Sequence, residues 1–135
     1  MGYRSEVAYV IEPVHIKPKE FLTDFLKEHK GVRKYLFSLG SLTVTDTQIR
    51  FKADWVKWYA GHEGVGGYHE VNAHVALVQW AEDRAEDAHY ANQGAFGRVG
   101  ENIDDNEVDW WGDEGYELIS IRVELVVAPL EEVSE

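Results

Sequence analysis

The segment YELISIRVELVV, residues 116–127, alternates apolar and polar side chains over nearly its whole length. A period of two residues is typical of a β-strand that buries one face and exposes the other. The buried face is predicted to carry Ile119, Ile121, Val123, Leu125 and Val127. Because a lone strand is not stable in water, the chain must contain a sheet whose one face rests on a core.

Three other segments have strand character. Residues 5–11 alternate up to Pro13, and residues 41–59 have the pattern of two strand arms around the polar turn TDTQ. This second alternation loses phase near Val56, which predicts a bulge or a strand end. The segment ANQGAFGRVGEN, residues 91–102, is predicted to be a strand or hairpin arm interrupted by glycine.

Helical spacing appears in two places. Residues 18–31 carry an apolar stripe between Pro18 and the terminating Gly31, and a short helical turn follows over residues 32–40. Residues 69–86 have a wide apolar face, which predicts a central, well-covered helix. A glycine-rich connection, residues 60–67, precedes that helix.

This order of elements predicts an α+β two-layer sandwich, with an about four-stranded, mostly antiparallel sheet and two or three helices on one face. The first and last strands are expected to pair at its centre. Hydrophobic residues make up 44% of the 135, enough for one core. We therefore predict a single domain over residues 1–128 and a frayed acidic tail over 129–135.

The net charge of −12 is unevenly distributed. Residues 101–135 carry twelve acids and one base, whereas residues 1–100 carry thirteen acids and twelve bases. The C-terminal quarter would repel a phosphate backbone, so direct binding of nucleic acid is not expected. The chain has no cysteine, no long apolar run and no signal-peptide pattern, which together favour a cytoplasmic location without membrane contact.

No motif indicates catalysis, a metal or a cofactor. The histidines at 62, 69 and 74 lack the i, i+4 spacing of a zinc helix, and the acidic stretch lacks the glycine of a calcium loop. The glycines at 94, 97 and 100 surround Arg98, which could grip an anion. They fit better as a bulged strand where glycine lets another group approach. We therefore predict a protein that is not an enzyme.

The stretch ENIDDNEVDWWGDEGYE, residues 101–117, holds eight carboxylates, no base and two adjacent tryptophans. Neighbouring residues of a strand face opposite sides, so at most one of the two indoles is expected to be buried. Aromatic side chains ringed by charge are typical of a binding hot spot. The predicted docking loop for a partner with a basic surface comprises Asp104, Asp105, Glu107, Asp109, Trp110 and Trp111.

Three sequence blocks, MGYRSEVAYVI, VKWYAG and GRVGENIDD, resemble a group of small bacteriophage proteins. Members begin MGYRS followed by Asp or Glu and Val, carry Lys-Trp-Tyr near mid-chain, and have Arg-x-Gly-Glu followed by acids. This chain departs from them by a glycine-rich connection after its Lys-Trp-Tyr. The resemblance implies an accessory protein that binds and inhibits a host or defence protein, and it supplies no catalytic residues.

Two alternatives stay open. The first is a sponge that sequesters an anionic nucleotide second messenger, in a pocket where bases and aromatic side chains converge within the chain or at a subunit interface of a homo-oligomer. Its ligand-binding residues would be Arg98, Arg50, Lys52, Trp58 and Tyr59. The second is a nucleic-acid mimic, which is weaker because the acids cluster in one loop instead of lining a rigid element.

Overall fold

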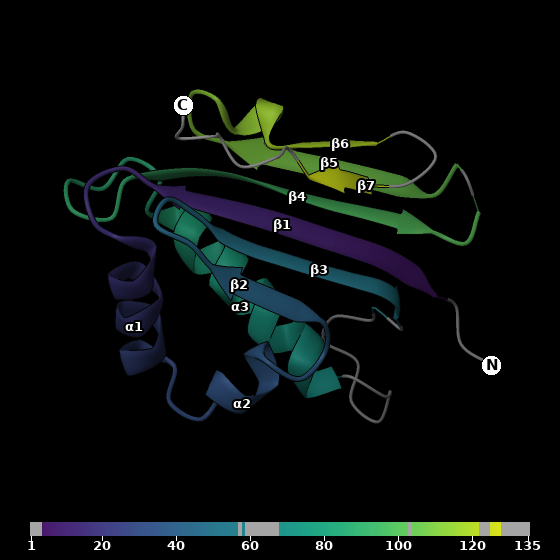
Figure 1. Ribbon diagram of the computed structural model, residues 1–135, viewed down its shortest axis with the longest axis horizontal. Helices are drawn as coiled ribbons and strands as arrows, with labels where there is room; N and C mark the ends of the chain where they lie inside the picture. Colours follow the sequence, from purple (N-terminus) through teal and green to yellow (C-terminus); the bar gives the residue numbers. More distant parts are fainter. Residues whose placement is uncertain (1–3, 57, 59–67, 103, 122–124, 128–135) are drawn as a thin grey trace.

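An open antiparallel sheet of five strands forms one layer of the protein, and the helices cover one of its faces (Figure 1). The computed structural model describes residues 4–56, 58, 68–102, 104–121 and 125–127. Across the sheet the strands run β2 (Ser41–Val44), β3 (Ile49–Val56), β1 (Ser5–Pro13), β4 (Asn92–Gly100) and β5 (Asn106–Trp111). The predicted α+β sandwich is confirmed, with five strands in place of about four.

Three α-helices lie below this sheet: α1 (Pro18–Glu28), α2 (Arg33–Leu36) and α3 (Tyr68–Asp83). Proline at the first position of α1 suits a helix start, because its missing N–H would have no helical partner there. Gly31, with φ of 91°, lets the chain turn after α1. The helical segments predicted around residues 18–31, 32–40 and 69–86 are thus confirmed. The predicted connection over residues 60–67 lies outside the described residues.

Strand β1 is the centre of the fold. Its residues Val7 to Ile11 are all fully buried, because both faces of the strand are covered. Val7, Tyr9 and Ile11 belong to the main core with the helices, whereas Ala8 and Val10 contact Ala95 and Leu118 on the other face. The register of β1 with β3 shifts opposite Val56, where the sequence predicted a bulge.

The cover on the second face comes from the segment that the sequence predicted to be one long strand. It forms two short strands, β6 (Ile119–Ile121) and β7 (Leu125–Val127), which pair with each other as a separate antiparallel sheet over β1 and β4. The expectation that the first and last strands pair is therefore wrong. Both arms keep the same alternation, so periodicity alone cannot reveal that the chain reverses between them.

Helix α3 is less well covered than its apolar face predicted. Val71, Leu77 and Trp80 are buried against the sheet, but Val75 is 36% exposed and Val78 is only half-buried. Neighbouring strands lie about 4.8 Å apart and a helix is about 10 Å wide. The two helices that pack on the sheet, α1 and α3, are therefore too narrow to cover all five strands. Because α3 packs on β4 and β1, the helix-side face of β5 is left largely open.

Candidate functional site

The acidic stretch predicted to be a docking loop contains a regular strand at the edge of the sheet. Strand β5 pairs with β4 alone among the described strands, and five of its six residues are exposed. The ladder with β4 fixes which face each residue takes. Glu107, Asp109 and Trp111 lie on the helix side, while Val108 and Trp110 lie on the opposite side and are 36% and 54% exposed.

Trp111 is a core residue, which corrects its assignment to an exposed docking site. Its indole is 6% exposed and lies against Gly94, its ladder partner, where a Cβ atom would collide with the ring. The indole Nε1 donates a hydrogen bond of 2.6 Å to Oδ1 of Asn92. At most one tryptophan was expected to be buried, and that expectation is confirmed. The sequence predicted that glycine in this strand lets another group approach, and at Gly94 that group is the indole of Trp111.

Arg98 is held by ion pairs with the acidic hairpin that leads into β5. Its Nη2 lies 2.7 Å from Oδ1 of Asp105, and its Nε lies 2.8 Å from Oε1 of Glu107. The hydrogen bond that Arg98 donates to Asp105 raises the pKa of Arg98 above its usual value, so this side chain stays charged and engaged. Arg98, Asp105 and Glu107 therefore tie β4 to the hairpin, and their assignment to ligand and partner binding stays a prediction.

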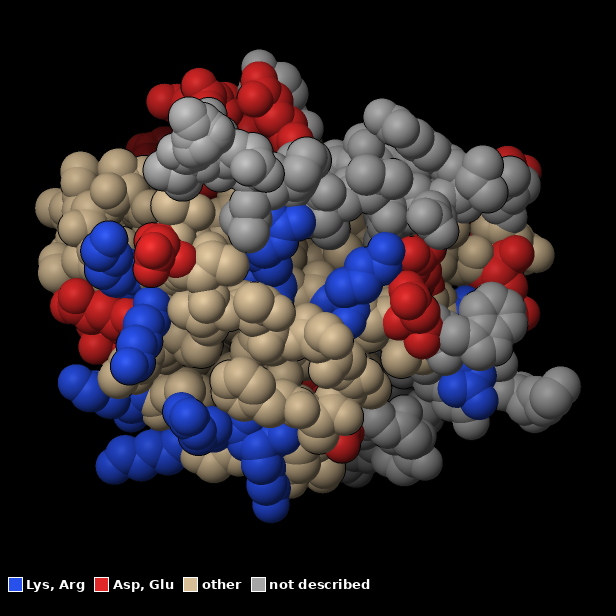
Figure 2. All heavy atoms as spheres, viewed as in Figure 1, with Lys and Arg blue, Asp and Glu red and all other residues tan. Residues whose placement is uncertain are grey.

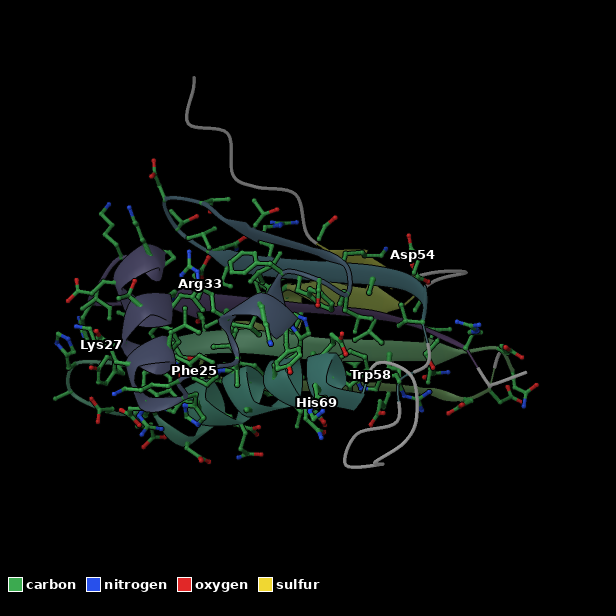
Figure 3. All side chains as sticks on the ribbon, turned by 90° about the horizontal axis from the view of Figure 1, so that it is seen from below. Phe25, Lys27, Arg33, Asp54, Trp58 and His69 are labelled. Carbon is green, nitrogen blue, oxygen red and sulfur yellow. The ribbon has the colours of Figure 1, made fainter. Side chains whose placement is uncertain are left out.

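The residues of the predicted nucleotide site do not converge within one chain. Arg50 and Lys52 lie on the face of β3 away from the helices, where Lys52 pairs with Glu6 at 2.8 Å. Trp58 lies on the helix side beside the first turn of α3, which carries His69 (Figure 3). The remaining member, Tyr59, lies outside the described residues.

Two carboxylates of the predicted docking set are left without a salt bridge among the described residues. These are Asp104, in the turn before β5, and Asp109, on the helix side of β5. Both are exposed. Together with the exposed ring of Trp110 they form an acidic and aromatic edge, which we call the β5 edge and define as Asp104, Val108, Asp109 and Trp110.

A groove of about 220 Å³ runs between α3 and the helix side of the β5 edge. Trp58, Phe96 and Trp111 provide aromatic walls, and α3 contributes a flank of spaced residues. That flank consists of Val75, Val78, Gln79 and Glu82. Sequence reasoning missed the groove: the spacing of these four residues marks one helix face, but which strand lies opposite depends on the strand order.

A buried pair lies deeper in the same layer. The hydroxyl of Tyr9 and Nδ1 of His74 are 2.7 Å apart, and both side chains are fully buried. Burial lowers the pKa of His74 to about 4 and raises that of Tyr9, so both groups are neutral at pH 7. The tautomer of the neutral imidazole decides which of the two groups donates this hydrogen bond. No partner lies at Nε2 of His74 within the described part of the chain.

One group of side chains has a geometry that could hold a metal ion. Glu20, Asp24 and His89 offer ligand atoms within 4.8 Å of one another. Asp24 already accepts a 2.8 Å hydrogen bond from the Tyr90 hydroxyl and lies 3.7 Å from Lys27. These contacts explain why the three side chains lie close together: they belong to a hydrogen-bonded surface group that joins α1 to the turn before β4.

Charge is segregated across the molecule. Six bases and three acids lie between residues 17 and 34, and Figure 2 shows basic side chains gathered over α1 and α2. Acidic side chains gather at the opposite end, over the turn that leads into the 3-10 helix η1 (Gly115–Glu117). The C-terminal end of β5, with Asp109 and Trp110, leads into this acidic turn, so the local field there favours a cationic partner.

No protein-family model, curated protein or solved structure matches the chain. Within the described residues, no helix has the length and apolar character needed to cross a lipid bilayer. Function must therefore be argued from the chemistry of the surface and not from the fold.

Proposed function

We propose that the protein acts by binding a partner protein with a basic surface, which it blocks without catalysis. The observation that carries this proposal is the β5 edge, where acids and an exposed tryptophan lie on the outermost strand of the sheet. In the bacteriophage setting that the sequence resemblance implies, the partner would be a host or defence protein.

Chemistry supports a basic partner over a second copy of the chain. Tryptophan is enriched among residues that dominate binding energy, and nearby carboxylates speed encounter with a positively charged surface. Two β5 strands pairing with each other in antiparallel order would bring Glu107 and Asp109 of each copy close together. Like charges facing each other across strands are destabilising, so a strand or loop rich in lysine and arginine fits better.

The proposal is tested by capturing partners from bacterial lysate and identifying them by native mass spectrometry. The test variant combines Asp104→Lys with Trp110→Ala, and it retains Trp111 because that residue belongs to the core. We expect the variant to keep its melting temperature and to lose the partner that the unaltered protein captures. Capture should also weaken as salt increases, because exposed charges are screened.

A matched control replaces one exposed acid elsewhere. Asp46→Lys, in the β2–β3 turn, changes the net charge by the same amount as Asp104→Lys. The control variant should capture the partner normally. Equal capture by the test variant, or equal loss in the control, would remove the β5 edge as the docking surface.

A further inference from the structure

We propose that the groove beside β5 is a pocket for a cationic side chain, and specifically for the guanidinium group of an arginine on the partner protein. This inference deepens the proposed function and rests on it for the source of the arginine.

The walls of the groove suit a flat cation. The rings of Trp58 and Phe96 lie 6.0 Å apart between their centroids, with planes tilted by 39°, and the edge of Trp111 lies nearby in the same lining. Aromatic faces attract cations through the negative potential of the ring, most strongly for tryptophan. A guanidinium is planar and weakly hydrated, so it stacks on such faces better than an ammonium group does.

The rim of the groove carries only negative charge among its lining residues. Glu82 approaches from α3 and Asp109 from β5, and Gln79 is the only other polar residue of the lining. Neither carboxylate has an ion-pair partner within the described residues, in contrast to Asp105 and Glu107, which Arg98 engages. The forked N–H groups of an arginine would supply the missing counter-charge to both sides.

Size restricts what the groove can take. Its volume of about 220 Å³ is smaller than the roughly 300–1,000 Å³ of pockets that hold drug-sized ligands. One long side chain fits this space, whereas a whole nucleotide would also place its phosphates against Glu82 and Asp109. Charge and volume therefore select a single basic side chain.

The pocket is also adjacent to the surface proposed for docking. Asp109 and Trp111 belong to β5, so a partner segment lying along the β5 edge would pass over the mouth of the groove. A basic side chain on that segment could enter the groove while its neighbours contact Trp110 on the other face of the strand. The two surfaces would then act as one interface.

The test uses a small probe so that no partner is needed. Nα-acetyl-arginine methylamide is titrated into the protein while the indole N–H signals of the tryptophans are followed by NMR. We expect saturable shifts for Trp58 and Trp111. The neutral isostere Nα-acetyl-citrulline methylamide should give none, because it keeps the shape of arginine and lacks the charge. The lysine analogue should bind more weakly.

Two variants test whether the arginine probe binds in this pocket. Asp109→Asn combined with Glu82→Gln should raise the dissociation constant about fivefold or more, since both ion contacts to the guanidinium are lost. Glu86→Gln, an equally conservative change at an exposed acid outside the groove, should leave it unchanged. Equal shifts from citrulline, absence of saturation up to the solubility limit, or equal affinity in the double variant would each overturn the pocket.

The outcome separates this inference from the function on which it rests. An arginine probe that fails while capture still depends on Asp104 and Trp110 would overturn the pocket and leave docking in place. In the opposite case the arginine probe binds, but changes at Asp104 and Trp110 do not affect capture. That result would support the pocket and overturn docking through the β5 edge.

Discussion

Trp111 packs its indole against the backbone of Gly94, its direct partner across the β4–β5 ladder. A Cβ atom at position 94 would meet the ring and would also lie 2.7 Å from the carbonyl oxygen of Val10. We predict that Gly94→Ala lowers the free energy of unfolding by about 2 kcal/mol or more, measured by urea denaturation, because overpacking forces the neighbours apart. Ala88→Gly, at an exposed turn position, is a suitable control. Gly31→Ala is not, because Gly31 has a positive φ. A stable Gly94→Ala protein would contradict the close packing.

Asn92 joins three parts of the fold through one buried amide. Its Nδ2 donates to the carbonyl oxygens of Ala81 and Tyr90, each at 2.9 Å, and its Oδ1 accepts from Trp111. We predict that Asn92→Ala costs about 2–4 kcal/mol of unfolding free energy, because buried groups lose their partners. Gln79→Ala, at an exposed position on α3, should change it by less than about 0.5 kcal/mol. Similar values for both variants would refute the role of Asn92.

His74 should make stability depend on pH. Its pKa is about 4 in the folded protein and 6.5 in its ordinary state, so the unfolded chain binds the proton more tightly between these values. Protonation therefore favours unfolding, and stability should fall as the pH drops from 6.5 towards 4, by about 3 kcal/mol from this group. Urea denaturation across that range should show the fall, and His74→Gln should reduce it. An NMR titration that places the imidazole pKa of the folded protein near 6.5 would contradict this account.

Arg98 should contribute to stability and not to ligand affinity. Arg98→Ala leaves Asp105 and Glu107 facing each other without a counter-charge, and we expect it to cost about 1–2 kcal/mol of unfolding free energy. Arg98→Lys keeps the charge but loses the forked guanidinium that reaches both acids. Its free energy of unfolding should therefore lie between those of the unaltered protein and of Arg98→Ala. Thermal melts at low and high salt measure both effects, and the loss should shrink as salt increases. Unchanged melting of Arg98→Ala would mean that the hairpin does not depend on these contacts.

The main layers of the fold could be predicted because their elements have strong periodic patterns. The apolar positions of β1, β3 and α1 recur at strand or helix spacing, and the core uses them as predicted. Strand β5 was harder to recognise because an edge strand does not need a buried face. Its residues alternate acids with Val108 and Trp110, and only its last residue, Trp111, is buried.

The candidate site depends on facts that no local pattern contains. The sequence indicated the acids and tryptophans of the β5 edge, but not that Arg98 engages Asp105 and Glu107. Nor could it place Glu82 opposite Asp109, because those residues meet only once α3 is set beneath β4. Strand order and helix placement are properties of the whole chain, so both the groove and the burial of Trp111 required the structure.

The central position of β1 sets an order of events during synthesis. This strand is synthesised before both of its neighbours, which span residues 49–56 and 92–100. Contacts over such separations form only after long loops close, which slows folding. The nascent chain must therefore hold an apolar strand that lacks one of its two partners until residues 92–100 have been made. During that interval, β1 is the segment most in need of protection from aggregation.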